Sequence, residues 1–498
     1  ALTLNDSPNV QFNNRYVGMF VQDDWKVTPR FTLNLGVRYD LENGRIADGN
    51  TQNGFSLDQI NPAAGVPGVV TFAGVNEPER LFDTDKNNIA PRLGFAWRPF
   101  GDDKTVLRGG AGLFYGNPDD SGYNNTAVLG FSTQAQRVSP DQNQTPVVLL
   151  KNGVQGIKAP GPEDRTAAFG VGSAVDFYQR QRATPYSMQY NVGIEHEVHS
   201  ILLNAQYLAN LGRKLTANGL SMNQVAPDLV GKAGSIQSRR PFPQFTDVVL
   251  DSPNLGASSY HAFMLRVEKR YHNGLQFLAN YTFSKFMDNV DSLTDFGGTP
   301  GVGYQDYYNR RLDKALSPND ITHNLTFNVI YDLPAGRGRR WLSSGPLSEI
   351  LGGWQVSVLG TLMSGPPYGV STQQNTCECF SAGPQRANIL RDPTLPGDQR
   401  TPQRWFDTDA FSQPARFTFG NAARSVGRAP GTMNYDMAIM KNFPFRERFR
   451  AQFRGELFNG FNQTNFGIPG TAFGSPNFGT ITTAKPARVI QLGLKLYF

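Results

Sequence analysis

Two histidines beside two glutamates are the first candidates for chemistry in this chain. His196 and His199 form an H-x-x-H pair, and Glu195 and Glu197 stand next to the first of them. Histidine and carboxylate side chains at short spacing are typical of zinc sites. The surrounding residues alternate as in a strand, however, and side chains three positions apart on a strand point to opposite faces. The sequence therefore does not predict that these histidines share a metal.

Two further clusters contain suitable residue types without the spacing of a site. Asp320 and His323 resemble an acid–base pair, but the chain has no G-x-S-x-G nucleophile elbow, so a polar cluster at the start of a strand is favoured. The run D-T-D-K-N-N at 83–88 resembles the start of a calcium loop. It lacks the turn glycine, and Gly94 stands where the glutamate ligand belongs. We predict no catalytic residue, metal or cofactor.

The two cysteines and a glycine cluster also have structural explanations. Cys377 and Cys379 form a lone C-x-C in a polar segment, which indicates loop residues or a local disulfide, because two ligands make a weak metal site. Gly109, Gly110 and Gly112 interrupt a strand pattern, and no strand–loop–helix pattern follows them. Bends in the sheet, or room for a neighbouring domain, are favoured over a phosphate cradle.

The composition indicates a sheet wall with long polar loops. Charged residues make up 18% and hydrophobic residues 39% of the 498 residues, while aromatic residues reach 12%, with 52 Gly and 33 Pro. No apolar run reaches the roughly 18 residues of a transmembrane helix. Residues 1–10 lack the basic start and apolar block of a signal peptide, so we expect a processed or truncated chain.

The net charge of +6 does not indicate a nucleic-acid partner, because the basic residues are spread along the chain. The densest basic segment runs from Arg337 to Arg340. We expect it in a solvated link between strands, with contact to anionic lipid headgroups as the alternative.

The last eleven residues predict a strand with one apolar face and one polar face. Alternation places the apolar residues together, because strand side chains point to opposite faces in turn. Its length is close to the ~9–11 residues that cross a hydrocarbon layer at a tilt. An amphipathic strand of a soluble sandwich is the alternative. The apolar face comprises Ile490, Leu492, Leu494, Leu496 and Phe498.

Segments with the same alternation recur along the chain, whereas helical periodicity is nearly absent. In the segment 448–462 the polar face contains Arg450, Arg454 and Glu456. Charge at mid-strand needs pairing in a dry sandwich core, but a wet lumen tolerates it. We count about thirteen segments, at roughly 15–27, 31–42, 88–100, 105–116, 183–198, 201–212, 258–272, 274–288, 317–333, 354–370, 434–445, 448–462 and 485–498.

The connections alternate between short and long, which predicts a sidedness. Short links such as Thr28–Arg30, His199–Ser200 and Asn273–Gly274 alternate with long ones, and the link 334–353 is the longest on the short side. Outer-membrane barrels have short periplasmic turns and long extracellular loops. We therefore expect residues 1–14 outside the cell and the carboxy terminus on the periplasmic side. The long links are roughly 43–87, 117–182, 213–257, 289–316, 371–433 and 463–484.

Aromatic residues fall at two heights of this arrangement, as in the interfacial girdles of membrane barrels. The expected inner girdle comprises Trp25, Phe31, Trp97, Tyr271, Tyr331, Trp354, Phe445 and Phe449. The residues expected near the outer rim are Tyr39, Tyr115, Tyr186, Tyr281 and Tyr435. The prediction is an all-β fold, a transmembrane antiparallel β-barrel with up-and-down meander topology and long extracellular loops.

Several stretches resemble one family. Residues 16–40, YVGMFVQDDWKVTPRFTLNLGVRYD, closely resemble a strand–turn–strand unit of TonB-dependent outer-membrane transporters, and the final strand resembles the terminal insertion signal of bacterial outer-membrane barrels. Further likenesses are APRLGFAW at 90–97, NYTFSK at 280–285 and FNGFNQTNF at 458–466. The chain is most similar to the Oar-like branch, with a carboxypeptidase-regulatory-like domain, a plug and a barrel.

The resemblance implies that residues 1–498 are the carboxy-terminal part of a receptor barrel in the bacterial outer membrane. It implies about 22 strands in the whole barrel, of which this chain holds about thirteen. The plug and amino-terminal domains are absent from this sequence. The implied partners are outer-membrane lipid, the barrel assembly machinery, an extracellular ligand, and a plug and TonB through the upstream region.

Two functions stay open. In the first, the loops capture a ligand for uptake, and polar residues of the lumen line its route or hold the plug. In the second, the chain is a surface-binding or structural barrel, or a passive porin. An enzyme is not predicted. The lumen-facing candidates, which pairing across the wall would explain equally, are Arg38, Arg92, Arg108, Arg266, Arg450, Arg454 and Glu456.

Overall fold

The dominant feature of the computed structural model is one large antiparallel sheet. The structure describes the chain apart from residues 1, 81, 102, 117–125, 140, 142–143, 145, 150, 152–155, 218, 290–303, 381–384 and 447–448 and the side chains of 444–449. In the sheet, here called the wall, each long strand pairs with the next long strand along the chain. Its strands are β3 (Tyr16–Thr28), β4 (Phe31–Glu42), β8 (Ile89–Trp97), β9 (Thr105–Tyr115), β12 (Tyr186–Val198), β13 (Ile201–Leu215), β16 (Gly256–His272), β17 (Leu275–Asp288), β19 (His323–Asp332), β20 (Trp354–Met363), β26 (Thr432–Arg446), β27 (Phe449–Phe458) and β29 (Val489–Tyr497).

The thirteen predicted segments are confirmed, and so is the meander order. The tight turns have the backbone that their sequences favour. Asn273 and Gly274 have φ of 53° and 79°, and His199 and Ser200 have φ of 46° and 65°. Positive φ at both central residues matches the right-handed twist of a two-residue hairpin. No helix in the described part of the chain is long and apolar enough to cross a membrane.

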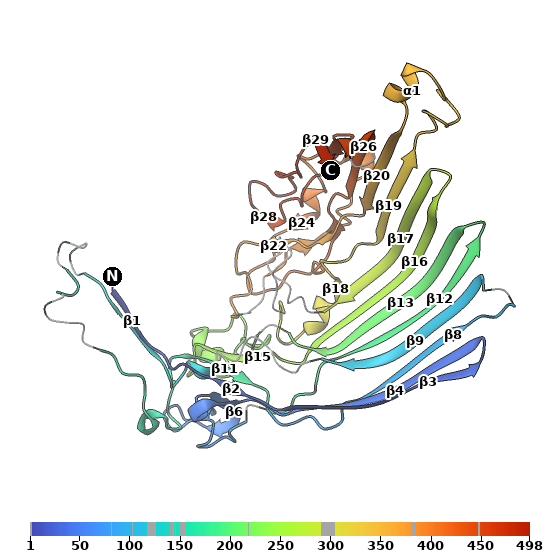
Figure 1. The fold of residues 1–498 in the computed structure, drawn as a ribbon. Coiled ribbons are helices and arrows are strands. Elements are labelled where there is room, and N and C mark those ends of the chain that lie inside the picture. The colour runs from blue at the N-terminus through green and yellow to red at the C-terminus, as the bar shows by residue number, and fades with distance from the viewer. Residues whose placement is uncertain are drawn as a thin grey trace.

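The wall is curved and has two edges (Figure 1). It runs from β3 and β4, in blue, to β26 and β29, in orange and red, and β3 and β29 each pair with one neighbour among the described residues. The short turns lie at one end of the strands, the turn side. The long connections gather at the other end, the loop side.

The long connections fold into small sheets. Residues 2–6 pair with 133–137, so the segment before the wall joins the loop side, as predicted. The paired strands are β1 (Leu2–Asp6) with β10 (Thr133–Arg137), β2 (Phe12–Asn13) with β5 (Ile46–Ala47), β6 (Asn53–Ile60) with β7 (Pro67–Phe72), β11 (Ala174–Tyr178) and β14 (Leu220–Ser221) with β15 (Asp247–Asp251), β21 (Pro367–Tyr368) with β25 (Gly427–Arg428), β22 (Ser371–Thr372) with β28 (Ala472–Phe473), and β23 (Asn388–Ile389) with β24 (Phe411–Ser412).

The remaining elements are short. β18 (Ala315–Leu316) pairs with the loop end of β17. The α-helix α1 (Pro346–Leu351) lies in the link between β19 and β20, on the turn side. The 3-10 turns are Asp48–Asn50, Pro162–Asp164, Gln237–Arg239, Arg310–Asp313, Gly397–Gln399 and Thr408–Ala410.

The hydrophobic core lies in the loops and not in the wall. One cluster joins three long connections through residues such as Phe55, Phe177 and Phe245. A second cluster centres on Tyr368, Phe406 and Phe411. The composition had suggested long polar loops, but their aromatic residues bury one another and hold the loops in fixed shapes. We call this set of packed connections the loop assembly.

The glycines of β9 leave the pairing of the strand intact. Gly109, Gly110 and Gly112, for which bends in the sheet or room for a neighbouring domain are predicted, lie in a stretch of β9 that pairs continuously with β12. A Cβ at Gly109 would collide with the ring of Phe95 on the neighbouring strand. The glycine makes room for that ring, which covers the backbone in place of a side chain of its own.

Candidate functional site

The seven lumen candidates lie on one face of the wall. Directly paired residues of neighbouring strands share a face, and Arg92 pairs with Gly36 on one side and Gly112 on the other. Arg266 pairs with Asn204 and Asn280, and the remaining candidates occupy equivalent alternate positions. We call this the polar face. Its candidates are Arg38, Arg92, Arg108, Arg266, Arg450, Arg454 and Glu456.

Most of these arginines have partners on their own strand or the next. Three are paired with a carboxylate two positions further along: Arg38 with Asp40 at 2.8 Å, Arg266 with Glu268 at 2.6 Å and Arg454 with Glu456 at 3.0 Å. Two stack on rings, since the guanidinium of Arg92 lies 4.6 Å from the Phe114 centroid and that of Arg450 lies 4.3 Å from the Tyr497 centroid. The polar face is therefore charged but largely self-paired.

The opposite face is apolar and open to the surroundings. Leu35 pairs with Leu93, which pairs with Ala111, and Leu35 and Leu93 are both exposed. In β29, Ile490, Leu492, Leu494 and Leu496 lie on this face, and Leu492 is 71% exposed. The apolar side chains thus face outward and do not pack against each other in a dry interior. Phe498 follows β29 and is exposed.

The aromatic candidates for the inner girdle lie at the turn side. Phe31 pairs directly with Trp97, and Trp25 pairs with Leu33, on the apolar face. Tyr331 and Trp354 lie on the same face, opposite Val356 and Lys441 respectively. Phe445 and Phe449 belong to β26 and β27, but their side chains lie outside the described residues.

Tyr271 turns to the polar face, unlike the other described girdle candidates. It is at the turn side, but its hydroxyl donates to the Asp332 carboxylate, and Asp332 pairs with Gln355 on the polar face. The register of β16 shifts between Lys269 and His272, where the strand holds one extra residue. A bulge of this kind turns the following side chains to the other face.

The tyrosines expected at the outer rim have specific contacts near the loop side. The Tyr39 hydroxyl donates to the carbonyl of Lys86 at 2.8 Å. The rings of Tyr115 and Tyr186 have centroids 5.9 Å apart. Tyr281 and Tyr435 contact rings as well, those of His323 and Phe461 respectively. The contacts of Tyr39 and Tyr435 join the wall to the connections above it, whereas those of Tyr115 and Tyr281 join neighbouring wall strands.

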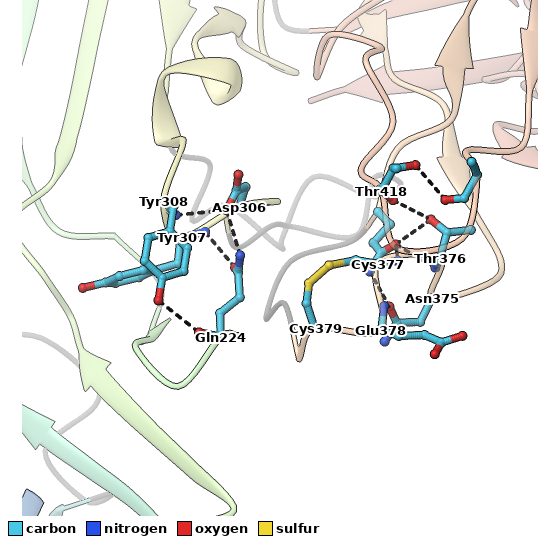
Figure 2. The surroundings of a disulfide bond; sticks show 12 residues. Gln224, Asp306, Tyr307, Tyr308, Asn375, Thr376, Cys377, Glu378, Cys379 and Thr418 are labelled. Atoms are coloured by element: carbon cyan, nitrogen blue, oxygen red, sulfur yellow. Dashed lines mark hydrogen bonds between the residues drawn. A yellow bond between two sulfur atoms is a disulfide. The ribbon is translucent and has the colours of Figure 1, made fainter. Parts of the chain in front are cut away.

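Three long connections meet at one point of the loop assembly (Figure 2). Gln224 donates from Nε2 to Asp306 at 2.8 Å and accepts from the backbone N–H of Tyr307 at 2.8 Å. The next residue, Val225, donates its N–H to the carbonyl of Cys379 at 2.9 Å. Cys377 and Cys379 form a disulfide and are both buried, which confirms the local disulfide alternative.

Buried ion pairs join the loop assembly internally and to the wall. Arg386 binds Asp313 at 2.6 Å, with side chains only 8% and 4% exposed. Burial raises the pKa of Asp313, and the positive charge of Arg386 opposes that rise. Arg424 pairs with Asp288 at the loop end of β17, and Arg428 with Asp320 just before β19. The connections are thus fixed over one end of the wall.

The clusters with catalytic residue types are not assembled into a site. His196 accepts or donates through Nδ1 with the Thr105 hydroxyl at 2.8 Å, while His199 lies in the turn. Asp320 binds Arg428, and His323 contacts the Tyr281 hydroxyl at 2.8 Å. Among the described residues, no group of three or more His, Cys, Asp or Glu side chains is placed to hold a metal.

The calcium-like run 83–88 contributes to packing between loops. Asp83 pairs with Arg180 at 2.8 Å, and Asp85 accepts the backbone N–H of Thr184 at 2.8 Å. These carboxylates hold residues 180–184 close to the start of β8. The motif therefore has a structural role here.

Residues that sequence reasoning did not find lie mainly in the loop assembly. Gln224, Asp313 and Arg386 are buried polar residues in long connections, where no periodic pattern marks them. The half-buried Asp176 of β11 was also not found. Burial raises its pKa to about 6, and the negative charges of Asp251 and Asp247 add to this rise. A usable signal was present only for the arginine pairs, because R-x-D or R-x-E within a strand places both charges on one face.

The fold and its two faces define a class of protein. A meander of long antiparallel strands, apolar on an exposed face and charged on the other, is the wall of a transmembrane β-barrel. Residues 2–491 match the family model described as outer membrane beta barrel domain. The chain belongs to this family, and its location is the bacterial outer membrane.

Solved structures with a similar arrangement include outer-membrane receptors. The pyoverdine outer membrane receptor FpvA of Pseudomonas aeruginosa is 10% identical with a TM-score of 0.43, over 99% of this chain and 44% of that one. The FrpB iron transporter of Neisseria meningitidis is 10% identical (TM-score 0.43; 98% of this chain, 45% of that one). The siderophore receptor PiuA of Acinetobacter baumannii is also 10% identical (TM-score 0.43; 98% and 44%). The chain spans less than half the length of these structures. No curated protein matches it.

Proposed function

We propose that this chain is the carboxy-terminal barrel section of a TonB-dependent, Oar-like receptor that takes up a ligand captured on its loops. One observation supports this best: the connections on one side of the wall are packed into a single loop assembly above a polar, arginine-bearing face. Preformed loops provide a binding surface, and a polar face provides a wet route through the membrane.

Energy for uptake would come through TonB, because a passive barrel cannot concentrate a ligand. The proposal therefore includes an upstream plug that closes the lumen and a segment that contacts TonB. It also includes recognition of β29 and Phe498 by the barrel assembly machinery. The arginines of the polar face would line the route or hold the plug.

Planar-bilayer conductance tests the gate. The full-length protein is expected to conduct little, and deletion of the plug is expected to produce a large, steady conductance. Equal conductance with and without the plug would count against a gated transporter.

Ion selectivity of the plug-deleted protein tests the polar face. Arg108→Glu should shift the reversal potential toward cations, because Arg108 lies on the polar face. Leu107→Met is the matched control, since Leu107 pairs with Trp97 on the apolar face and should leave selectivity unchanged. If both variants behave like the parent protein, the polar face does not line the conducting route.

A second candidate is a surface-binding or structural barrel that transports nothing. It is favoured by the same packed loop assembly, because a fixed surface suits attachment to a partner or polysaccharide. An upstream sequence without plug or TonB-contact segment would favour this candidate or a passive porin.

A further inference from the structure

The link between β19 and β20 is built differently from the tight turns beside it. It spans residues 333–353 and contains α1. Its two ends are held together, since Leu333 donates its N–H to the carbonyl of Trp354 at 2.9 Å and Gly353 donates to Ala335 at 3.0 Å. A Cβ on Gly336 would collide with the backbone of Gly352, so the two halves pack backbone against backbone. The link therefore has a defined shape.

α1 presents an uncovered apolar stripe. Leu347, Ile350 and Leu351 have the i, i+3, i+4 spacing that places side chains on one face of a helix. They are 58%, 64% and 51% exposed, and Trp341 in the same link is 58% exposed. Nothing in the described part of the chain covers this stripe.

Lys441 fastens the end of α1 to the apolar face of the wall. Lys441 lies on that face, between its partners Trp354 and Phe453, and is only 4% exposed. Its ammonium donates to the carbonyls of Glu349 and, at 2.8 Å, Ile350. A lysine facing lipid is costly unless its charge is satisfied, and the last carbonyls of a helix are suitable acceptors. The end of α1 is thus held against the lipid-facing surface.

The link is also basic. Residues 334–353 contain Arg337, Arg339 and Arg340 against one acid, Glu349. Arg337 is 3.0 Å from Glu349 but 83% exposed, and Arg339 is 3.3 Å from Asp332. Exposed pairs of this kind are weak, so their guanidinium groups remain available to phosphates.

We propose that residues 333–353 form a membrane-interface element that inserts the apolar stripe of α1 into the turn-side phospholipid leaflet and binds anionic headgroups through its arginines. The attachment of α1 to the lipid-facing wall and the positive charge both point to a lipid surface as the occupant. The proposal needs the barrel in its membrane but does not depend on transport.

Nitroxide labels on introduced cysteines test the insertion. Leu347→Cys, Leu351→Cys and Ser344→Cys are each labelled in proteoliposomes of phosphatidylethanolamine and phosphatidylglycerol. Cys377 and Cys379 are joined to each other and do not take the label. Labels at 347 and 351 should collide with oxygen, which concentrates in the bilayer, and be shielded from an aqueous nickel chelate. The label at the exposed Ser344 should show the reverse. If all three are equally accessible to nickel, the stripe lies in water and the proposal is wrong.

A charge variant tests the headgroup contact separately. Arg337→Gln with Arg340→Gln should move the labels at 347 and 351 toward the aqueous phase, and so should vesicles without phosphatidylglycerol. Arg391→Gln with Arg416→Gln removes two charges from the loop side and should change nothing. Equal label depth in all of these samples would overturn anionic lipid binding.

Discussion

At the scale of single residues, three of the six candidate arginines on the polar face are paired with a carboxylate two positions away. Such pairs keep charge on the polar face and hold the side chains in place. Exposed pairs contribute about 0–1 kcal/mol, so their main effect is on the shape and charge of the surface. The ion pairs of the loop assembly are buried, and the loss of one partner is more costly there.

Arg386→Met should loosen the loop assembly. The variant leaves the Asp313 carboxylate buried without its partner, and loss of one member of a buried pair costs about 3–5 kcal/mol. We expect chymotrypsin to cleave residues 371–433 at lower urea concentration than in the parent protein. Arg391→Met is the control, because its pair with Asp407 is exposed on the arginine side and Arg404 also binds Asp407. Equal urea midpoints for the parent and both variants would contradict the role of the buried pair.

Asp176 predicts a pH dependence of the loop assembly. Its pKa of about 6 lies above the ordinary aspartate value of about 4, so the folded loops bind this proton more tightly than the unfolded chain. Stability should therefore fall as the pH rises from about 4 through about 6. We expect slower proteolysis around β11 and β15 at about pH 5 than at about pH 7.5.

The matched variants are Asp176→Asn, which should remove most of this difference, and Asp58→Asn, an exposed carboxylate in β6, which should preserve it. Any effect of pH on the protease itself is the same for both variants, so it cancels in the comparison. The same pH response in both would show that Asp176 is not the group responsible.

At the scale of elements, each wall strand has an apolar face and a polar face. β29 does this with Leu492 on the apolar face and Gln491 on the polar face, where Gln491 pairs with Glu456. A side chain that is moved by one position along the strand therefore passes from the apolar face to the polar face, or the reverse.

Leu492→Arg should destabilise the wall, while Gln491→Arg should not. An arginine at the lipid face near mid-membrane costs about 2–4 kcal/mol. At position 491 the same side chain meets Glu456 across the strand pair. We expect a lower urea midpoint and less protein in the outer membrane for Leu492→Arg only. If the two variants lose stability equally, the assignment of the faces in β29 is incorrect.

At the scale of the whole molecule, the wall has two edges that lipid does not tolerate. Unpaired backbone groups in hydrocarbon cost several kcal/mol each, so β3 and β29 must find partners in the membrane. Because thirteen strands alternate in direction, β3 and β29 run the same way. Direct closure would require a parallel pair, whereas barrels of this class close with antiparallel strands.

Cross-linking tests how the edges are satisfied. Cysteines from Gln22→Cys and Gln491→Cys lie on the polar face of the two edge strands. We expect no internal cross-link on oxidation in the membrane, because other strands should separate these edges. Gln22→Cys with Gly36→Cys is the positive control, since these residues pair directly. Efficient linking of positions 22 and 491 would instead demonstrate a small barrel closed by this chain alone.

The sequence by itself determined the wall: its thirteen strands, its tight turns, and which residues share a face. These features depend on alternation between neighbouring residues and on turn geometry, both of which are local. The local disulfide was one of two outcomes that the C-x-C spacing left open.

Only the tertiary structure decided where the core lies and how the loops join. Phe55 meets Phe245, and Arg386 meets Asp313, through irregular segments that have no repeating geometry to indicate which residues meet. The bulge that turns Tyr271 to the polar face and the contact of Lys441 with α1 also depend on partners distant in the chain. Alternation along a strand fixes a direction for each side chain, but contacts between loops depend on how the whole chain packs.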